Sequence, residues 1–195
     1  MRFEELRIAG AALVHIEPRT DARGFFARTF CAHEFAAHGL PAAAVQASVS
    51  YNIRAGTVRG MHFQWPPSQE GKLVRCLRGR LFDVLIDLRP DSVSYLQHQA
   101  VDLDQDNRTA VFIPAGIAHG FQTLADETEV LYQMTDFYLP ELQCGYRWND
   151  PQFGISWPLP ATVISDRDAA CADFDRAAHE SEYRQRHAAA VPAPR

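Results

Sequence analysis

The feature that most constrains the fold is a succession of short apolar segments through the middle of the chain. They are rich in Val, Ile, Leu, Phe and Tyr, and several alternate apolar with polar residues, which is typical of β-strands. Turn residues such as Arg78-Gly79 and Pro114-Ala115-Gly116 separate them. Many short strands at this spacing predict an antiparallel sandwich or barrel. The expected strands are Val58–Gln64, Lys72–Cys76, Arg80–Leu88, Gln97–Leu103, Thr109–Ile113 and Glu129–Phe137.

Helices are expected only near the two ends of the chain. The segment Ala32–Gly39 predicts a short helix that ends at its glycine. The segment 168–190 is rich in Ala, Arg, Glu and His, which predicts one or two helices packed against the barrel. A chain of 195 residues suits one domain. We therefore expect a single all-β domain over 1–195, with its barrel over roughly 45–160.

Composition excludes several classes of function. The net charge is −5, and no basic run indicates a nucleic-acid surface. No apolar stretch is long enough to span a bilayer. Glu4 and Glu5 lie where a signal peptide needs a basic start, so we expect a cytoplasmic protein without membrane contact. The four cysteines are widely spaced, which favours reduced thiols over a disulfide framework or a zinc site: Cys31, Cys76, Cys144 and Cys171.

Residues suited to chemistry are densest between Thr57 and Lys72. His62 and Gln64 lie two positions apart on an expected strand, so their side chains point to the same face. A polar face inside a barrel usually indicates a ligand cavity. Arg59 and Lys72 add charge to the same region, which favours a site over an isolated surface histidine. Two further segments carry His119 after a glycine turn and Tyr132 on a strand.

Two histidine-bearing strands beside glycine turns also suggest a cupin-type barrel. A metal-binding cupin needs two or three histidines and usually a carboxylate around the ion. Here only His62 and His119 are candidate ligands, because Gln64 occupies the usual partner position and Glu70 is the one acidic residue close by. We therefore expect no metal. A metal-dependent dioxygenase or isomerase remains the alternative that metal analysis would test.

Seven motifs in order give the chain a family resemblance. They run from near the N-terminus to about Phe174 and are DARGFFARTF (21–30), VRGMHFQ (58–64), KLVRCLRGRLFDVLIDLR (72–89), IPAGIAHGF (113–121), Tyr132 with Tyr138, WNDPQFGISWP (148–158) and SDRD (165–168). With these motifs the chain resembles the dTDP-4-dehydrorhamnose 3,5-epimerases. The resemblance implies a cupin-type jelly-roll barrel without metal or cofactor. It also implies a homodimer formed by exchange of N-terminal strands.

The resemblance further implies roles for individual residues. His62 would be the general base with Asp168 as its orienting partner. Lys72 would stabilise the oxyanion, and Tyr132 would be the general acid on the opposite face. Residues at family positions that hold the dTDP-sugar are Arg23, Phe26, Gln46, Ser48, Arg59, His119 and Tyr138. Of these, Arg23 and Phe26 are expected to act across the dimer interface.

These residue types suit proton transfer next to a ketone. A histidine base has a pKa near working pH, and a carboxylate partner fixes its tautomer. A cation lowers the barrier where the enolate oxygen develops charge, and an acid on the other face returns the proton. We therefore expect epimerisation at C3 and C5 of dTDP-4-keto-6-deoxy-D-glucose, giving dTDP-4-keto-L-rhamnose.

Three positions depart from the usual family pattern, and they bear on the substrate. Arg28 replaces a frequent glutamate, Ser48 stands where an asparagine is typical, and Asn52 stands where a serine is common. An epimerase that inverts C3 only or C5 only, acting on a related nucleotide sugar, is therefore an open alternative. A non-catalytic sensor of the same fold would be expected to lack His62 or Lys72, and both are present.

Overall fold

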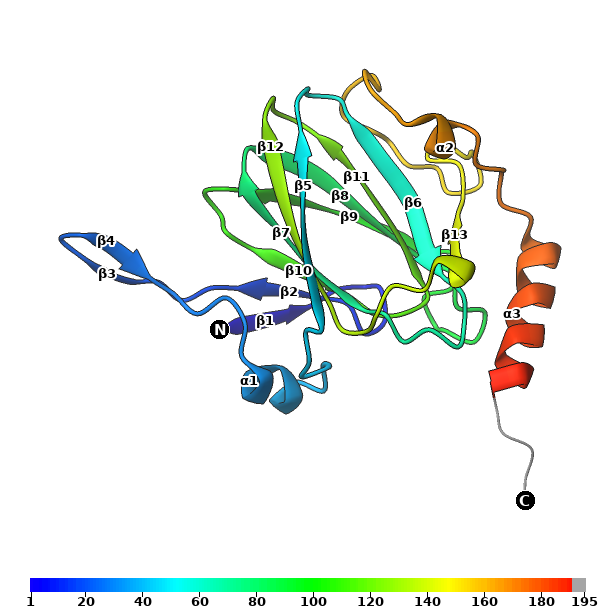
Figure 1. Cartoon of the computed structure of the whole chain (residues 1–195), viewed down its shortest axis with the longest axis horizontal. Helices are drawn as coiled ribbons and strands as arrows, with labels where there is room; N and C mark the ends of the chain where they lie inside the picture. Colours follow the sequence, from blue (N-terminus) through cyan, green and yellow to red (C-terminus); the bar gives the residue numbers. More distant parts are fainter. Residues whose placement is uncertain (191–195) are drawn as a thin grey trace.

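Two antiparallel sheets form the body of the protein (Figure 1), and the computed structural model describes residues 1–190. The larger sheet contains, in spatial order, β1 (Arg2–Glu5), β2 (Ala12–His15), β10 (Ala110–Ile113), β7 (Lys72–Arg78), β12 (Thr128–Met134) and β5 (Gln46–Asn52). The smaller contains β13 (Gln143–Gly145), β6 (Val58–Gln64), β11 (Ile117–Thr123), β8 (Arg80–Asp87) and β9 (His98–Asp104). The expected jelly-roll class is confirmed.

The core lies between the sheets, and its composition follows from strand alternation. Val74 and Val130 of the larger sheet pack with Leu81, Leu85 and Phe121 of the smaller one, and all five are essentially fully buried. Such a core stabilises the sandwich by about 1.5–3 kcal/mol for each large apolar side chain removed from water.

The outer face of the smaller sheet is also covered. Met61 and Phe63 point outward from β6 and pack with Phe153 and Phe174 of the C-terminal part of the chain. Because successive strand residues face opposite ways, His62 must point into the space between the sheets. The alternation of β6 therefore delivers a polar side chain to the interior, as the sequence predicts.

Two glycines allow β6 and β11 to approach closely beside this position. A Cβ at Gly60 would lie 2.6 Å from the Cα of Gly120, and one at Gly120 would lie 2.5 Å from the Sδ of Met61. Gly60 also has a φ of +119°, which a residue with a side chain rarely adopts. A larger residue at either position would push the histidine-bearing strands apart.

The helices lie at the ends of the chain, as expected. α1 (Ala32–Ala37) ends two residues before Gly39, whose φ of +70° suits a glycine after a helix. The C-terminal segment contains α2 (Asp166–Ala169) and α3 (Arg176–Ala190), and a short 3-10 helix η1 spans Pro140–Leu142. None of the helices among residues 1–190 is long and apolar enough to cross a membrane.

The sequence placed the central strands well and overlooked others. Val58–Gln64 is β6 without adjustment, and the other expected strands overlap β7, β8, β9, β10 and β12 with shifted ends. β1, β2 and β5 were not expected, so the larger sheet begins well before residue 45. β5 has the sequence QASVSYN, in which polar residues line a cavity and apolar ones lie on the exposed face. Its alternation is that of a strand, but the pattern alone assigns the buried face to the wrong side.

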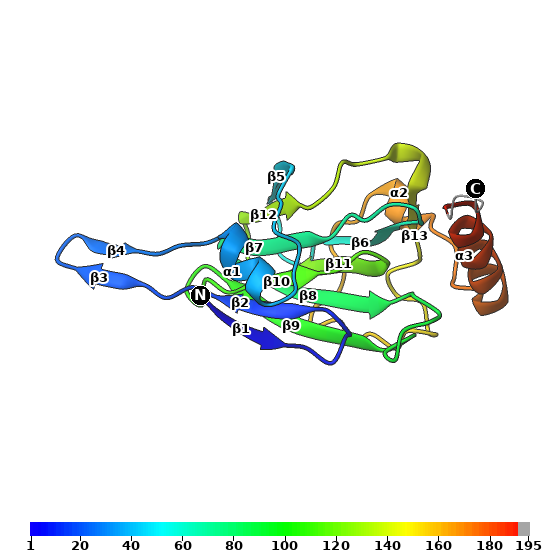
Figure 2. The same cartoon turned by 90° about the horizontal axis from the view of Figure 1, so that it is seen from below.

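A separate hairpin projects from the barrel. β3 (Arg19–Asp21) pairs only with β4 (Gly24–Phe26), and all six residues are exposed. Figures 1 and 2 both show the hairpin extending away from the two sheets, on the side opposite α3. Phe26 at its end is 78% exposed, which is unusual for a large apolar side chain.

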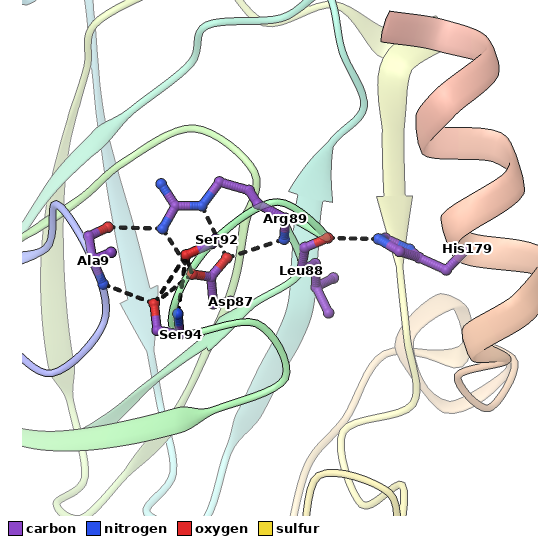
Figure 3. Close-up of polar contacts among 7 residues, drawn as sticks. All are labelled: Ala9, Asp87, Leu88, Arg89, Ser92, Ser94 and His179. Carbon is purple, nitrogen blue, oxygen red and sulfur yellow. Dashed lines mark hydrogen bonds and ion pairs between the residues drawn. The ribbon is translucent and has the colours of Figure 1, made fainter.

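The end of β8 ties three distant segments together (Figure 3). Asp87 is fully buried and accepts hydrogen bonds from Arg89, Ser92 and Ser94. Arg89 and Ser94 in turn bond the backbone of Ala9, between β1 and β2. The adjacent Leu88 carbonyl accepts a hydrogen bond from His179 of α3. The N-terminal strands and the C-terminal helix are thus anchored to one strand of the barrel.

Candidate active site

Two adjoining cavities of about 380 and 400 Å³ open between the sheets, and both are lined by His62, Lys72 and Tyr132. The first also contains Arg59, His119 and Asp168, and the second contains Gln46, Ser48 and Tyr138. Every candidate site residue expected from the sequence therefore lines this space except Arg23 and Phe26.

His62 and Asp168 form a hydrogen-bonded pair on one wall. The Nε2 of His62 lies 2.7 Å from Oδ1 of Asp168, while Oδ2 accepts a hydrogen bond from the Gly60 N–H at 3.1 Å. Burial would raise the pKa of Asp168, but these two hydrogen bonds outweigh it and hold the pKa below its usual value. An ionised carboxylate only accepts, so Nε2 of His62 carries the hydrogen and Nδ1 is left as a proton acceptor.

The first turn of α2 holds Asp168 in place. Ser165 caps this short helix by accepting a hydrogen bond from the Asp168 N–H at 3.1 Å. Asp168 is 4% exposed, whereas the side chain of His62 is 31% exposed. The pair thus combines a fixed, buried carboxylate with an imidazole that can reach the cavity.

Lys72 and Tyr132 face His62 from the larger sheet. Lys72 begins β7, and its Nζ lies 3.3 Å from Oε1 of the buried Glu70. Tyr132 lies on the neighbouring strand β12. Burial, reinforced by the negative charge of Asp83, raises the pKa of the Tyr132 phenol well above its usual value. The phenol is therefore protonated at neutral pH.

Asn52, a departure from the family pattern, positions Arg59. Its Oδ1 accepts a hydrogen bond from the Arg59 Nε at 2.7 Å, and its Nδ2 donates to the Thr128 carbonyl at 3.1 Å. Asn52 is 2% exposed, so its amide is fixed by β12 on one side and holds the guanidinium on the other. A serine is too short to bridge both groups in this way.

The second cavity is formed by residues from β5 and from the segment after β12. Gln46 accepts a hydrogen bond from the Tyr138 backbone N–H at 2.8 Å, and Tyr138 donates its hydroxyl to Gln143. Ser48 lies on the same face of β5, two residues from Gln46. Tyr138 is 44% exposed, so its ring is accessible for stacking with a planar group.

Three residues of the N-terminal arm lie elsewhere. Arg23 and Phe26 lie on the exposed β3–β4 hairpin, where Arg23 pairs with Asp21 at 2.5 Å. Arg28 forms an ion pair with Glu34 of α1 at 2.8 Å. The positive charge of Arg28 is thus paired within the arm, and none of the three residues lines the two cavities between the sheets.

One pair inside the barrel was overlooked in the sequence. Nε2 of His119 lies 2.8 Å from Oδ2 of Asp83, and the two residues are 5% and 0% exposed. The signal is visible in retrospect, because Asp83 interrupts the apolar stretch RLFDVLID of β8 at an inward position. Buried carboxylates require partners, so an aspartate at this position indicates a hydrogen-bond donor or cation inside the barrel.

The described part of the chain offers little for a metal ion. Across residues 1–190, no group of three or more His, Cys, Asp or Glu side chains is arranged to hold one. All four cysteines are free thiols: Cys31, Cys76, Cys144 and Cys171.

Similarity to known proteins agrees with this geometry. The family model described as dTDP-4-dehydrorhamnose 3,5-epimerase matches residues 5–176, which include every candidate site residue. The chain belongs to this family. A dTDP-4-dehydrorhamnose 3,5-epimerase of Methanothermobacter thermautotrophicus is 44% identical over 170 residues, covering 86% of this chain and 91% of that protein.

Two further members of the epimerase family are informative. The crystal structure of the 3,5-epimerase from Bacillus anthracis with TDP and PPi bound has a TM-score of 0.86 and 34% identity, covering 89% of this chain and 99% of that one. A dTDP-4-dehydrorhamnose 3-epimerase of Streptomyces niveus is 36% identical over 169 residues, covering 86% of this chain and 81% of that protein. The family therefore includes enzymes named for one centre as well as for two.

Proposed function

We propose that this epimerase-family protein inverts C3 and C5 of dTDP-4-keto-6-deoxy-D-glucose to give dTDP-4-keto-L-rhamnose. The observation that carries the proposal is the placement of a base and an acid on opposite walls of one cavity. His62 projects from the smaller sheet and Tyr132 from the larger one, with Lys72 beside Tyr132. Inversion requires this arrangement, since the proton must leave from one face and return on the other.

Proton removal falls to His62. Its Nδ1 accepts the proton from the carbon beside the ketone, and the imidazolium that forms is stabilised by Asp168 at 2.7 Å. The electron pair of the broken C–H bond moves into the ring and places negative charge on the C4 oxygen.

Lys72 stabilises that oxyanion. Its ammonium carries the positive charge that the developing enolate requires, in a cavity where electrostatic interactions are stronger than in water. Glu70 lies 3.3 Å from Nζ and directs the ammonium without entering the reaction.

Tyr132 completes the inversion by protonating the carbon from the opposite face. Its raised pKa keeps the phenol protonated until the enolate, a stronger base, is present. The same pair of groups can act again at the second carbon once the sugar ring presents it to His62.

Two arginines in the first cavity suit the diphosphate of the substrate. Arg59, fixed by Asn52, and Arg167 of α2 both line it. Guanidinium groups donate in pairs to phosphate oxygens, which gives orientation as well as charge. The exposed ring of Tyr138 at the second cavity is suited to stacking on the nucleobase.

Inversion of C3 alone is the second candidate, and the Streptomyces niveus relative named as a 3-epimerase favours it. Proton NMR of dTDP-4-keto-6-deoxy-D-glucose with the enzyme in deuterated water separates the two. We expect deuterium at both C3 and C5. Deuterium at C3 alone would establish the single epimerase, and no incorporation would overturn the proposal.

The variant Tyr132→Phe tests the mechanism in the same experiment. His62 still removes the proton, so we expect hydrogen exchange with solvent to persist while epimer formation falls about 100-fold or more. Tyr95→Phe is the matched control, because its buried hydroxyl has no hydrogen-bond partner among residues 1–190. Unchanged epimer formation in Tyr132→Phe would remove the acid role.

The resemblance also suggests a homodimer formed by exchange of N-terminal strands. In support, the β3–β4 hairpin leaves Phe25 and Phe26 exposed, and the edge strand β5 leaves Val49 and Tyr51 exposed. A second copy could cover these groups and bring Arg23 to the neighbouring cavity. Light scattering of the full chain and of a Phe25→Ser/Phe26→Ser variant tests this; a monomeric native chain would refute it.

A further inference from the structure

Two carboxylates on the inner face of β8 are fully buried, and their surroundings differ sharply. Asp87 is saturated with hydrogen bonds from Arg89, Ser92 and Ser94 (Figure 3), which outweigh its burial and lower its pKa. Asp83 lies four residues earlier on the same strand and has one partner, His119. Its Oδ1 has no hydrogen bond among residues 1–190. The hydrogen bonds that join Asp87 to neighbouring segments account for its burial, whereas a single partner does not account for the burial of Asp83.

A buried carboxylate with a single neutral partner is costly, and a cationic partner offsets that cost. His119 is the side chain in a position to provide the charge. Its Nε2 donates to Asp83 at 2.8 Å, and no residue between 1 and 190 is hydrogen-bonded to its Nδ1. Nδ1 of His119 is therefore the atom at which the pair can take up and release a proton.

The position of His119 relates this proton to the acid of the reaction. His119 lies opposite His62 on the paired strand β11, and both line the first cavity. Its ring packs edge-on against Tyr132, with 6.0 Å between the ring centroids. The two rings are therefore neighbours, and the cavity that both residues line offers a proton a route between Nδ1 and the phenol oxygen.

We propose that His119 and Asp83 form a relay that returns a proton to Tyr132 after each inversion. The Tyr132 O–H bond breaks as its proton joins the carbon, which leaves a phenolate. The Nδ1–H bond of the His119 imidazolium then breaks, its electron pair stays on nitrogen, and the proton restores the phenol. His119 recovers a proton from solvent through cavity water when the sugar leaves. His62 releases the proton taken from substrate to solvent, so the two transfers balance and no net hydroxide remains. Asp83 is the positioning residue, since it acts only through His119.

The relay answers a need that rests on the proposed double inversion. Two successive inversions of one sugar require two protons from Tyr132, and the sugar occupies the cavity between them. The His62 side chain is 31% exposed and can exchange with solvent, whereas Tyr132 lines the cavities that the bound sugar would fill. A reserve proton beside Tyr132 allows the second inversion to follow without release of the intermediate.

The variant Asp83→Asn tests the relay by comparing the rate of the first inversion with the rate of later inversions. The amide still accepts from His119 Nε2, but it no longer stabilises an imidazolium. In a rapid-quench experiment we expect the first inversion within about threefold of the wild-type rate and later inversions slowed at least tenfold. In a double epimerase the singly inverted sugar should accumulate. In an enzyme that inverts one centre, one product molecule per active site should form rapidly, followed by slow turnover.

Asp87→Asn is the matched control. It removes the other buried carboxylate of the same strand without contact to His119, so any loss of stability should slow both phases alike. If Asp83→Asn slows both phases equally, or neither, the relay is refuted. His119→Gln is the second variant, because it retains a donor to Asp83 but carries no mobile proton. Since His119 also lines the substrate cavity, this change can slow both phases, and the relay requires that later inversions be slowed further than the first.

Failure of the underlying function is recognised separately. A wild-type enzyme that incorporates no deuterium from deuterated water would remove the epimerase proposal itself. A wild-type enzyme that does incorporate it, together with uniform slowing in Asp83→Asn, would remove only the relay.

Discussion

Replacing Asp168 by asparagine is the most informative single change, because the structure dictates how the new amide must lie. The Gly60 N–H requires an acceptor, which it now finds in Oδ2 at 3.1 Å. The oxygen of the introduced amide would therefore take that place, and its NH2 group would face Nε2 of His62. An NH2 group donates, so Nε2 must become the acceptor and the ring hydrogen must move to Nδ1. The nitrogen facing the cavity could then no longer accept a proton.

The expected loss follows from this reversed tautomer. A general base contributes about 10²–10⁴-fold to rate, and loss of the charge that stabilises the imidazolium acts in the same direction. We expect kcat/KM to fall by about 10³–10⁴-fold, or roughly 4–5.5 kcal/mol at 1.36 kcal/mol per decade. KM should change little, because Asp168 acts through His62. Loss of one charge-assisted hydrogen bond should lower the free energy of unfolding by about 1.5–3 kcal/mol.

The assay is deuterium incorporation at C3 and C5 followed by NMR, with thermal unfolding measured in parallel. Asp166→Asn is the matched control, since Asp166 lies on the exposed face of the same helix α2. An Asp168→Asn variant that folds and retains more than a tenth of wild-type kcat/KM would refute the proposed orientation of His62.

Two further predictions concern Arg59 and His179. In Asn52→Ser, Arg59 loses its 2.7 Å hydrogen bond. We therefore expect KM to rise about tenfold, equivalent to ~1.4 kcal/mol, with kcat nearly unchanged. Steady-state kinetics in which kcat fell and KM did not change would contradict this. His179 is 2% exposed, and burial lowers its pKa below the ordinary 6.5 despite the Leu88 hydrogen bond. The folded state therefore resists protonation of His179. The contribution of His179 to the free energy of unfolding is fully present above pH 6.5 and is lost as the pH falls toward the folded pKa, by at most ~1.4 kcal/mol per pH unit. Urea unfolding at several pH values should show a weaker dependence in His179→Gln, and an identical dependence would disprove the assignment.

The sequence anticipated most of the cavity because strand alternation is a local property. Once Val58–Gln64 is a strand, His62 and Met61 must face opposite ways, and the apolar Met61 and Phe63 assign the polar side to the interior. The roles of His62, Asp168, Lys72 and Tyr132 came instead from the resemblance to the epimerase family. The structure then placed Lys72 and Tyr132 on the sheet opposite His62.

Local patterns misled where neighbours, rather than the strand itself, decide burial. β5 alternates as a strand does, but it is polar toward the cavity and apolar toward the outside, so its pattern assigns the buried face to the wrong side. From the sequence, the departure at Asn52 bore only on the choice of substrate. Its partners Arg59 and Thr128 lie on two other strands, and only their proximity shows that the amide orients the guanidinium.

The sequence by itself determined the strands that carry the chemistry and the side chains available for it, because strand periodicity and residue type need no distant contact. Tertiary structure alone decided which of those side chains meet. Asp168 reaches His62 across 106 residues, and Asp83 reaches His119 across 36, through packing of elements that no local pattern relates. Pairing of this kind depends on how whole sheets and the C-terminal segment fold onto one another. The same dependence explains why His62 could be placed in a cavity from one strand, while the different partners of Asp83 and Asp87, the two buried carboxylates of β8, could not be predicted.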